Sequence, residues 1–386
     1  MNKIGYLESL RGIATLMVVL NHFVVGFYPS LYTGALVTCH IKNCGELFII
    51  QTPLFLLYAG NFAVCIFFIL SGYVLSFKFF KYNTRPLFVI HVIKRYFRLI
   101  APVLFSISIA YLFMKLGFFY NKEAALLTKS NWWLGTFWNF EPNFFEMIRQ
   151  SFIGVFFQKQ ISYNTLLWTM YYEFFGSILV FSIIFLFRKM TYRFLVYIIM
   201  IFWFINTYYL AFILGMALSD LYNNKPDLFK KYSNKFSIGL FFILGFFFAA
   251  YPKGFPVDNT MYSFLKLETI DSAIFYHIVG AFFVMLFLLM SQKIQKILSA
   301  KSLIYIGRLS FSIYVIHLIV IASFSSYIFP KFLNYFSYHM SFFITFICSL
   351  LLILVCSRYI YKYVDEKFGM RLSKKVYTYL NHYIKF

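Results

Sequence analysis

Charged residues are scarce in this sequence, and acidic residues are the scarcest. Charged residues make up 12% of the 386 residues, and only 13 residues are Asp or Glu, whereas soluble domains contain roughly 25% charged residues. Hydrophobic residues make up 61% of the chain. A soluble domain could not bury that much apolar surface. The composition therefore excludes a soluble globular protein and indicates an integral membrane protein.

Cysteine is also rare, and its positions contain no metal-binding spacing. Cys65, Cys348 and Cys356 lie in apolar runs, while Cys39 and Cys44 lie in one polar loop. These two form a disulfide or remain two free thiols, because sequence spacing alone does not define the geometry that a disulfide needs. We therefore expect no bound metal.

The apolar residues form ten runs of about 15 to 25 residues, the length that crosses a bilayer as a helix. The runs cover approximately 12–29, 54–77, 99–115, 163–187, 193–206, 207–221, 236–251, 272–291, 303–328 and 341–360. The boundary near Asn206 is the weakest, since one kinked span is the alternative to two short ones. The sequence thus predicts an all-α, multi-pass protein with about ten transmembrane helices.

Positive charges define the predicted orientation. With the N-terminus inside, the cytoplasmic segments contain 26 of the 35 Lys and Arg residues, as the positive-inside rule requires. Both termini are then cytoplasmic, and 1–386 is one domain with spans over about 12–362 and a tail at 363–386. Segment 82–98 mixes basic and apolar residues and is expected along the inner membrane surface, against lipids. The net charge of +22 is explained by these flanks, so we expect no nucleic-acid partner.

Ionisable side chains inside a span are costly and indicate function. His22 follows Arg11 by eleven residues, which is about 16 Å along a helix and close to three whole turns. The two side chains therefore share a helix face. A ligand along this face could place an anionic end at Arg11 and a reacting atom at His22. The alternative is a packing histidine.

Glu173 is predicted at a depth similar to that of His22. A carboxylate paired with His22 would orient the imidazole and raise its basicity. The alternative is a structural carboxylate held by an arginine or by water. In the ninth run, Ser310, Tyr314 and His317 share one face.

Three further features suggest ligand contacts. Ser71 and Gly72 allow close approach of a ligand or of another backbone, and small residues are common at helix contacts in membranes. Arg95 and Arg98 lie three residues apart at the inner boundary. They suit phosphate binding or ordinary anchoring to anionic lipids. Trp132, Trp133 and Trp138 form an aromatic belt or a platform for sugar rings.

Five short motifs follow one another along the chain. They are Tyr6–Ala14 with the R-x10-H pattern of Arg11 and His22, FFILSGY at 67–73, Arg95-x-x-Arg98-x-x-x-Pro102, Trp168-x4-Glu173, and Ile306-Gly307-Arg308-x-Ser310-x3-Tyr314-x2-His317. In this order they resemble the acyltransferase-3 family of membrane acyltransferases, from residue 6 to about 365. Asn21 departs from the pattern, where an aromatic or small residue is expected.

The resemblance implies that an acyl group, usually acetyl, moves from cytoplasmic acyl-CoA to a hydroxyl of an extracytoplasmic or lipid-linked glycan at the bacterial inner membrane. The chain ends without the periplasmic hydrolase-like domain of some members, which favours an acceptor that reaches the membrane itself. The implied catalytic residues are His22, Glu173 and Arg11. Arg95, Arg98, Ser71 and Gly72 are assigned to acyl-CoA, and Trp168, Tyr172, Ser310, Tyr314 and His317 to the substrate.

In this scheme His22 is a general base or a nucleophile, and Tyr314 and His317 donate hydrogen bonds to the oxyanion. The alternative function is a proton-coupled transporter or flippase, because intramembrane His and Glu also serve proton relays. The lack of a visible inverted repeat argues against it.

Overall fold

The computed structural model describes residues 4–84 and 86–383, and no β-strand occurs among them. The all-α prediction is therefore confirmed. Helices satisfy their own backbone hydrogen bonds, as a lipid environment requires. The longer helices are α1 (Gly5–Phe27), α4 (Gly60–Lys81), α5 (Phe88–Lys115), α9 (Trp168–Phe187), α10 (Arg193–Trp203), α11 (Tyr209–Asn224), α13 (Lys235–Ala249), α14 (Ser272–Met290), α16 (Lys301–Val320), α18 (Tyr338–Ile360) and α19 (Arg371–Tyr383). The shorter ones are α2 (Ser30–Thr33), α3 (Glu46–Gln51), α6 (Asn121–Thr128), α7 (Phe144–Arg149), α8 (Val155–Phe157), α12 (Pro226–Tyr232), α15 (Gln292–Leu298) and α17 (Ser326–Leu333).

Seven helical segments of the described chain are long and apolar enough to cross a membrane. An eighth is added if α12 and α13, which meet at 92°, count as one broken span. The chain is therefore a multi-pass membrane protein. The weak boundary near Asn206 separates two helices, α10 and α11, which have 11 and 16 residues. The count of ten spans stays a prediction.

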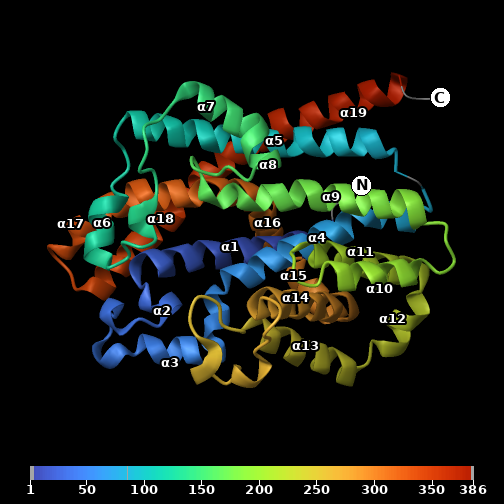
Figure 1. The fold of residues 1–386 in the computed structure, drawn as a ribbon, viewed down its shortest axis with the longest axis horizontal. Helices are drawn as coiled ribbons and strands as arrows, with labels where there is room; N and C mark the ends of the chain where they lie inside the picture. Colours follow the sequence, from blue (N-terminus) through green and yellow to red (C-terminus); the bar gives the residue numbers. More distant parts are fainter. Residues whose placement is uncertain (1–3, 85, 384–386) are drawn as a thin grey trace.

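Helix α4 lies at the centre of the bundle and packs against α1, α9, α11 and α14 (Figure 1). Helix α1 also packs along α16, and α16 packs against α18. Helix α5 packs against α9 and against α19. These contacts bring the motif-bearing helices α1, α4, α5, α9 and α16 into one group.

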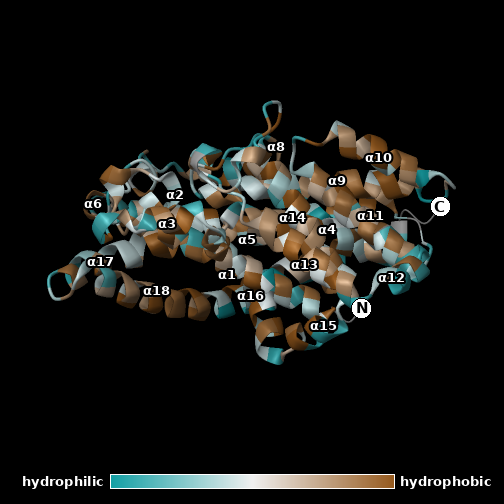
Figure 2. Cartoon of the chain, turned by 90° about the horizontal axis from the view of Figure 1, so that it is seen from below, coloured by the Kyte–Doolittle hydropathy of each residue, from teal (hydrophilic) through white to brown (hydrophobic). Residues whose placement is uncertain are grey.

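Hydrophobic residues cover the outside of the bundle as well as its core (Figure 2). Phe202 on α10, Phe236 on α13 and Leu351 on α18 are 70%, 78% and 59% exposed. Soluble monomers rarely expose contiguous apolar surface of this kind. These faces are suited to lipid contact.

The described ends of the chain lie toward the same end of the bundle, and α2, α3, α6 and α17 lie at the other end (Figure 1). This arrangement agrees with both termini on one side of the membrane. Which side is cytoplasmic stays a prediction from the charge distribution.

One predicted boundary is wrong. Segment 82–98 was expected as a separate surface element before a span at 99–115, but Phe88–Lys115 is one helix, α5, with Pro102 inside it. The tail predicted beyond residue 362 is helical as well, since the π-helical segment Tyr361–Met370 leads directly into α19. Both elements pack on α5.

The polar loop after α2 is held together at two points. Cys39 and Cys44 form a disulfide with a Cα–Cα distance of 5.4 Å, which resolves the alternative that the sequence left open. The carboxylate of Glu46 accepts hydrogen bonds from the backbone amides of His40 and Ile41 at 2.7 and 2.9 Å. The loop therefore has a defined shape at the end of the bundle that carries α3 and α6.

Candidate active site

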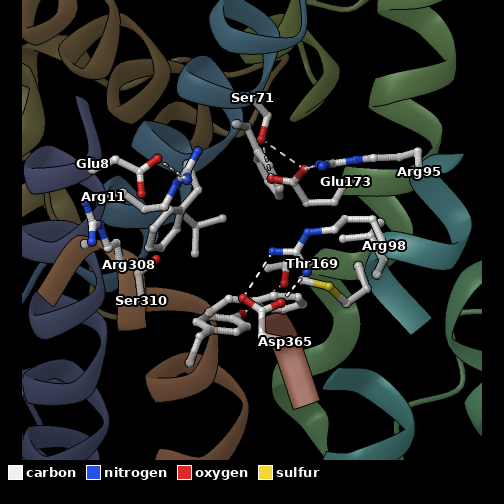
Figure 3. A pocket seen from close by; sticks show the side chains of 18 residues that line it. Glu8, Arg11, Ser71, Arg95, Arg98, Thr169, Glu173, Arg308, Ser310 and Asp365 are labelled. Carbon is white, nitrogen blue, oxygen red and sulfur yellow. Dashed lines mark hydrogen bonds and ion pairs between the residues drawn. The ribbon is translucent and has the colours of Figure 1, made fainter. Parts of the chain in front are cut away.

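A cavity opens where α1, α4, α5, α9 and α16 approach the segment Tyr361–Met370 (Figure 3). It contains about 870 Å³ of empty space, including the part open to solvent. We call it the inner cavity, after its predicted side of the membrane. Its polar lining residues are Glu8, Arg11, Ser71, Arg95, Arg98, Thr169, Glu173, Arg308, Ser310, Tyr314 and Asp365.

Glu173 is fixed by partners on two neighbouring helices. The Ser71 hydroxyl donates to both carboxylate oxygens, at 2.8 and 2.9 Å, and Arg95 Nη2 donates to Oε2 (Figure 3). Arg95 Nε donates to Ser177 Oγ at 2.9 Å. The predicted pairing of Glu173 with His22 is wrong, because these bonds direct the carboxylate toward α4 and α5. The alternative of an arginine-held carboxylate is confirmed.

Two more ion pairs line the inner cavity. Arg98 binds Asp365 through both terminal nitrogens, and Arg11 Nη1 lies 3.2 Å from Glu8 Oε1. Arg308 is exposed and makes no ion pair within the described residues. Four arginines therefore face three carboxylates in this lining. The excess positive charge suits an anionic ligand.

Gly72 serves helix packing and does not line the inner cavity. A Cβ atom at this position would lie 2.1 Å from the carbonyl oxygen of Phe212 on α11, and one at Gly215 would lie 2.1 Å from the carbonyl oxygen of Ile69. Both glycines are needed for backbone contact between α4 and α11. The structure places Ser71 in the lining of the inner cavity, bound to Glu173, and gives Gly72 the close backbone approach.

A second pair of glycines aligns α1 with α16. A Cβ atom at Gly12 would lie 2.8 Å from Gly307 N, and one at Gly307 would lie 2.0 Å from the carbonyl oxygen of Glu8. His22 and His317 each follow their glycine by ten residues, so they reach similar heights on neighbouring helices. Their rings stack at 5.1 Å, and His22 Nδ1 lies 2.8 Å from His317 Nε2.

The hydrogen bonds of this histidine pair define its tautomers. His317 Nδ1 lies 3.0 Å from the carbonyl oxygen of Ile313, which can only accept, so Nδ1 carries the proton. The other nitrogen of a neutral imidazole is an acceptor. His22 Nδ1 must then donate to His317 Nε2. His22 Nε2 is left unprotonated and has no hydrogen bond within the described part of the chain, so it is free to take a proton.

His22 faces a second cavity, with about 680 Å³ of empty space including its open part. We call it the outer cavity. Its residues are Val18, Asn21, His22, Tyr32, Phe55, Gly60, Asn61, Val64, Trp168, Tyr208, Lys253, His277 and Tyr314. Val64 and Tyr314 line both cavities. The two cavities therefore approach each other beside the histidine pair, although Arg11 lines one and His22 the other.

Tyr314 and His317 do not have the predicted oxyanion-donor geometry. The Tyr314 hydroxyl donates to the carbonyl oxygen of Leu166 at 2.8 Å and also contacts Thr169 Oγ1 at 3.0 Å. The His317 proton is directed at Ile313. Because both protons already have backbone acceptors, these residues position their neighbours and do not present a donor to a ligand.

The remaining predicted substrate residues divide between the cavities. Trp168 lines the outer cavity and packs against Tyr208, with ring centroids 5.2 Å apart. Ser310 lines the inner cavity. Tyr172 lines neither cavity and packs between Phe68 and Tyr208, so its assignment to the substrate stays a prediction.

Sequence reasoning missed several residues in and around the two cavities. Trp133, interpreted as part of an aromatic belt or a sugar platform, lines neither cavity but stacks on the His22 ring with centroids 5.4 Å apart. Asn61, Lys253 and His277 line the outer cavity. Asp365 lies in the segment predicted as a cytoplasmic tail. No local sequence signal marks Asn61 or Lys253, because Asn61 on α4 and Lys253 in the loop between α13 and α14 meet only in the folded bundle.

The structure is a helical membrane protein with two cavities that approach each other inside the bundle. The acyltransferase-3 family, described as an acyltransferase domain, matches residues 4–358. The chain belongs to this family and is a membrane acyltransferase. Neither the curated proteins nor the solved structures contain a significant match.

Proposed function

We propose that this acyltransferase moves an acyl group, with acetyl as the expected case, from cytoplasmic acyl-CoA to a hydroxyl group of an extracytoplasmic or lipid-linked glycan. One observation carries the proposal: the inner and outer cavities share Val64 and Tyr314 beside the available Nε2 of His22. Donor and acceptor can thus enter from opposite sides and meet at one base. The predicted setting is the bacterial inner membrane.

The donor side is supported by the charge of the inner cavity. The CoA phosphates are anionic, and arginine binds phosphate oxygens bidentately. Arg308 has no carboxylate partner among the described residues and is the first contact that we assign. Arg98 and Arg11 also face the cavity, but each binds a carboxylate. A phosphate would have to replace Asp365 or Glu8 at these two residues.

The reaction assigned to His22 is proton transfer at Nε2. This nitrogen takes the proton of the acceptor hydroxyl, whose oxygen forms the new bond to the thioester carbonyl carbon. The carbon–sulfur bond breaks, and the CoA sulfur leaves with the proton from His22. His317 stabilises the imidazolium by accepting from Nδ1. A relay in which Nε2 itself carries the acyl group needs the same unprotonated nitrogen.

The acceptor side is supported by the composition of the outer cavity. It combines aromatic rings with amide and hydroxyl groups, as sites for polar small ligands generally do. A sugar ring can pack an apolar face on Trp168 while its hydroxyl groups bind polar side chains. The transporter alternative loses support because the family is one of acyltransferases.

Release of free thiol from acetyl-CoA by purified protein in lipid nanodiscs tests this proposal. We expect release that depends on an added membrane glycan extract. His22→Gln should abolish it, because Gln cannot take the proton at neutral pH. His91→Gln is the control, since His91 lines neither cavity. Absence of glycan-dependent release, or unchanged release by His22→Gln, would contradict the proposal.

A further inference from the structure

The outer cavity contains one formal charge that neither the sequence motifs nor the proposed chemistry uses. Lys253, in the loop between α13 and α14, is its only Lys or Arg, and no Asp or Glu is among its described lining residues. A cavity that presents a cation without a carboxylate in its wall is biased toward anionic ligands.

The ammonium group of Lys253 is only weakly engaged by the protein. Its Nζ lies 3.4 Å from Asn61 Oδ1 and 3.9 Å from Asp271 Oδ2. Asp271 does not line the cavity, and its Oδ1 accepts the backbone amide of Ile274 as the N-cap of α14. Partly exposed ion pairs at this distance contribute little, so Lys253 keeps its charge and donor capacity for a ligand.

A hydrogen-bond chain fixes Asn61 beside Lys253. The Tyr208 hydroxyl donates to Asn61 Oδ1 at 2.5 Å, and Asn61 Nδ2 lies 2.7 Å from His277 Nδ1. His277 Nε2 lies 2.8 Å from the carbonyl oxygen of Tyr251 and must donate to it. His277 Nδ1 is therefore an acceptor, which orients the Asn61 amide.

This orientation determines what the wall offers to a ligand. The second Asn61 N–H and the Tyr32 hydroxyl have no hydrogen-bond partner among the described residues. Beside Lys253, the second Asn61 N–H is a donor and the Tyr32 hydroxyl can also donate, as an anion requires. Trp168 and Tyr208 add aromatic surface for the apolar face of a sugar ring.

We propose that the outer cavity selects an acceptor sugar that bears an anionic group, either a carboxylate or a phosphate, and that Lys253 binds this group. The inference rests on the proposed function for the statement that the ligand is an acceptor. It adds a specificity residue outside the five motifs. The anionic group would anchor the sugar at Lys253 while a hydroxyl of the same ring reaches His22.

Binding can be measured without turnover. Full-length protein in nanodiscs is titrated with methyl glucoside, methyl glucuronide and methyl glucoside 6-phosphate, and tryptophan fluorescence is recorded because Trp168 lines the cavity. We expect at least one anionic sugar to bind about tenfold more tightly than the neutral one, the lower end for one charge-assisted hydrogen bond. The tighter of the two anions identifies the carboxylate or the phosphate as the recognised group.

Lys253→Met should remove this preference and leave neutral-sugar binding unchanged. Lys266→Met is the matched control, because Lys266 pairs with Asp258 at 2.9 Å and lines neither cavity. Equal binding of neutral and anionic sugars, no binding of either anion, or a preference that survives in Lys253→Met overturns the inference.

Thiol release from acetyl-CoA is scored separately. Lys253-dependent binding without release would refute the proposed transfer and retain the inference about the ligand. Thiol release without any preference for anionic sugars would retain the proposed transfer and refute the inference about the ligand.

Discussion

The bond between His22 and His317 leads to a prediction that separates a base from the residue that orients it. His317→Ala removes the acceptor of the His22 Nδ1 proton, which lies 2.8 Å away in the native pair. His317 is fully buried, so no bulk water replaces it without a rearrangement. His22 would be free to rotate or to change tautomer, and Nε2 would no longer be reliably unprotonated.

The expected loss of activity in His317→Ala follows from the cost of leaving the buried His22 Nδ1–H without an acceptor, about 1–3 kcal/mol. If the full cost appears in the transition state, kcat falls roughly 5- to 150-fold, since about 1.4 kcal/mol is tenfold. Loss of the base itself in His22→Ala should cost more, ~10²–10⁴-fold. His317→Gln, whose side-chain oxygen can accept the same proton, should recover part of the activity.

Steady-state kinetics of thiol release with both substrates varied is the assay. The KM for acetyl-CoA should change little in His317→Ala, because His317 does not line the inner cavity. The double variant His22→Gln/His317→Ala should be no slower than His22→Gln alone, since a positioning residue acts only through the base. A full additional loss in the double variant, or wild-type kcat in His317→Ala at normal expression, would refute the reasoning.

Three further outcomes are expected. Arg308→Ala should weaken acetyl-CoA binding by about 1–3 kcal/mol and leave thermal stability normal. Arg95→Ala should lower the free energy of unfolding by about 3–5 kcal/mol, because it leaves the buried Glu173 without its arginine. Isothermal binding and thermal melts distinguish the two variants, and the reverse pattern would contradict the assignment. A cysteine at exposed Leu126 should react with an impermeant maleimide from outside, and one at exposed Leu228 should not; labelling at 228 from outside would reverse the predicted orientation. Gly72→Ala should reduce membrane expression by separating α4 from α11, and wild-type expression and melting would show that the contact is dispensable.

The sequence was sufficient for features that depend on one helix or on composition. Apolar runs located the long helices, because bilayer thickness sets their length. Helical periodicity placed Arg11 and His22 on one face of α1, and each residue lines a cavity. The break near Asn206 was also predicted, because two spans there keep the alternation of positive charge intact in the segments that follow.

Features that depend on helix packing were predicted less well. Equal depth suggested that Glu173 would meet His22, but depth does not specify which helix faces which. Ser71 and Arg95 lie on the helices that Glu173 faces, and they bind it instead. Asp365 was placed in a cytoplasmic tail because its segment follows the last apolar run and is rich in Lys and Arg. The π-helical turn that carries it packs on α5, where Arg98 needs a partner.

The paired glycines limit how this protein can move. Where backbones touch at Gly72 and Gly215, no side-chain layer can deform, so α4 and α11 must travel as one rigid body. Gly12 and Gly307 lock α1 to α16 in the same way. These four helices act as a fixed frame around the reaction site. Helix α5 lies outside this frame, because Arg95 pairs with Glu173 on α9 and Arg98 pairs with Asp365 in the segment that leads into α19. We therefore expect entry and release of the donor to occur by motion of α5 relative to the frame.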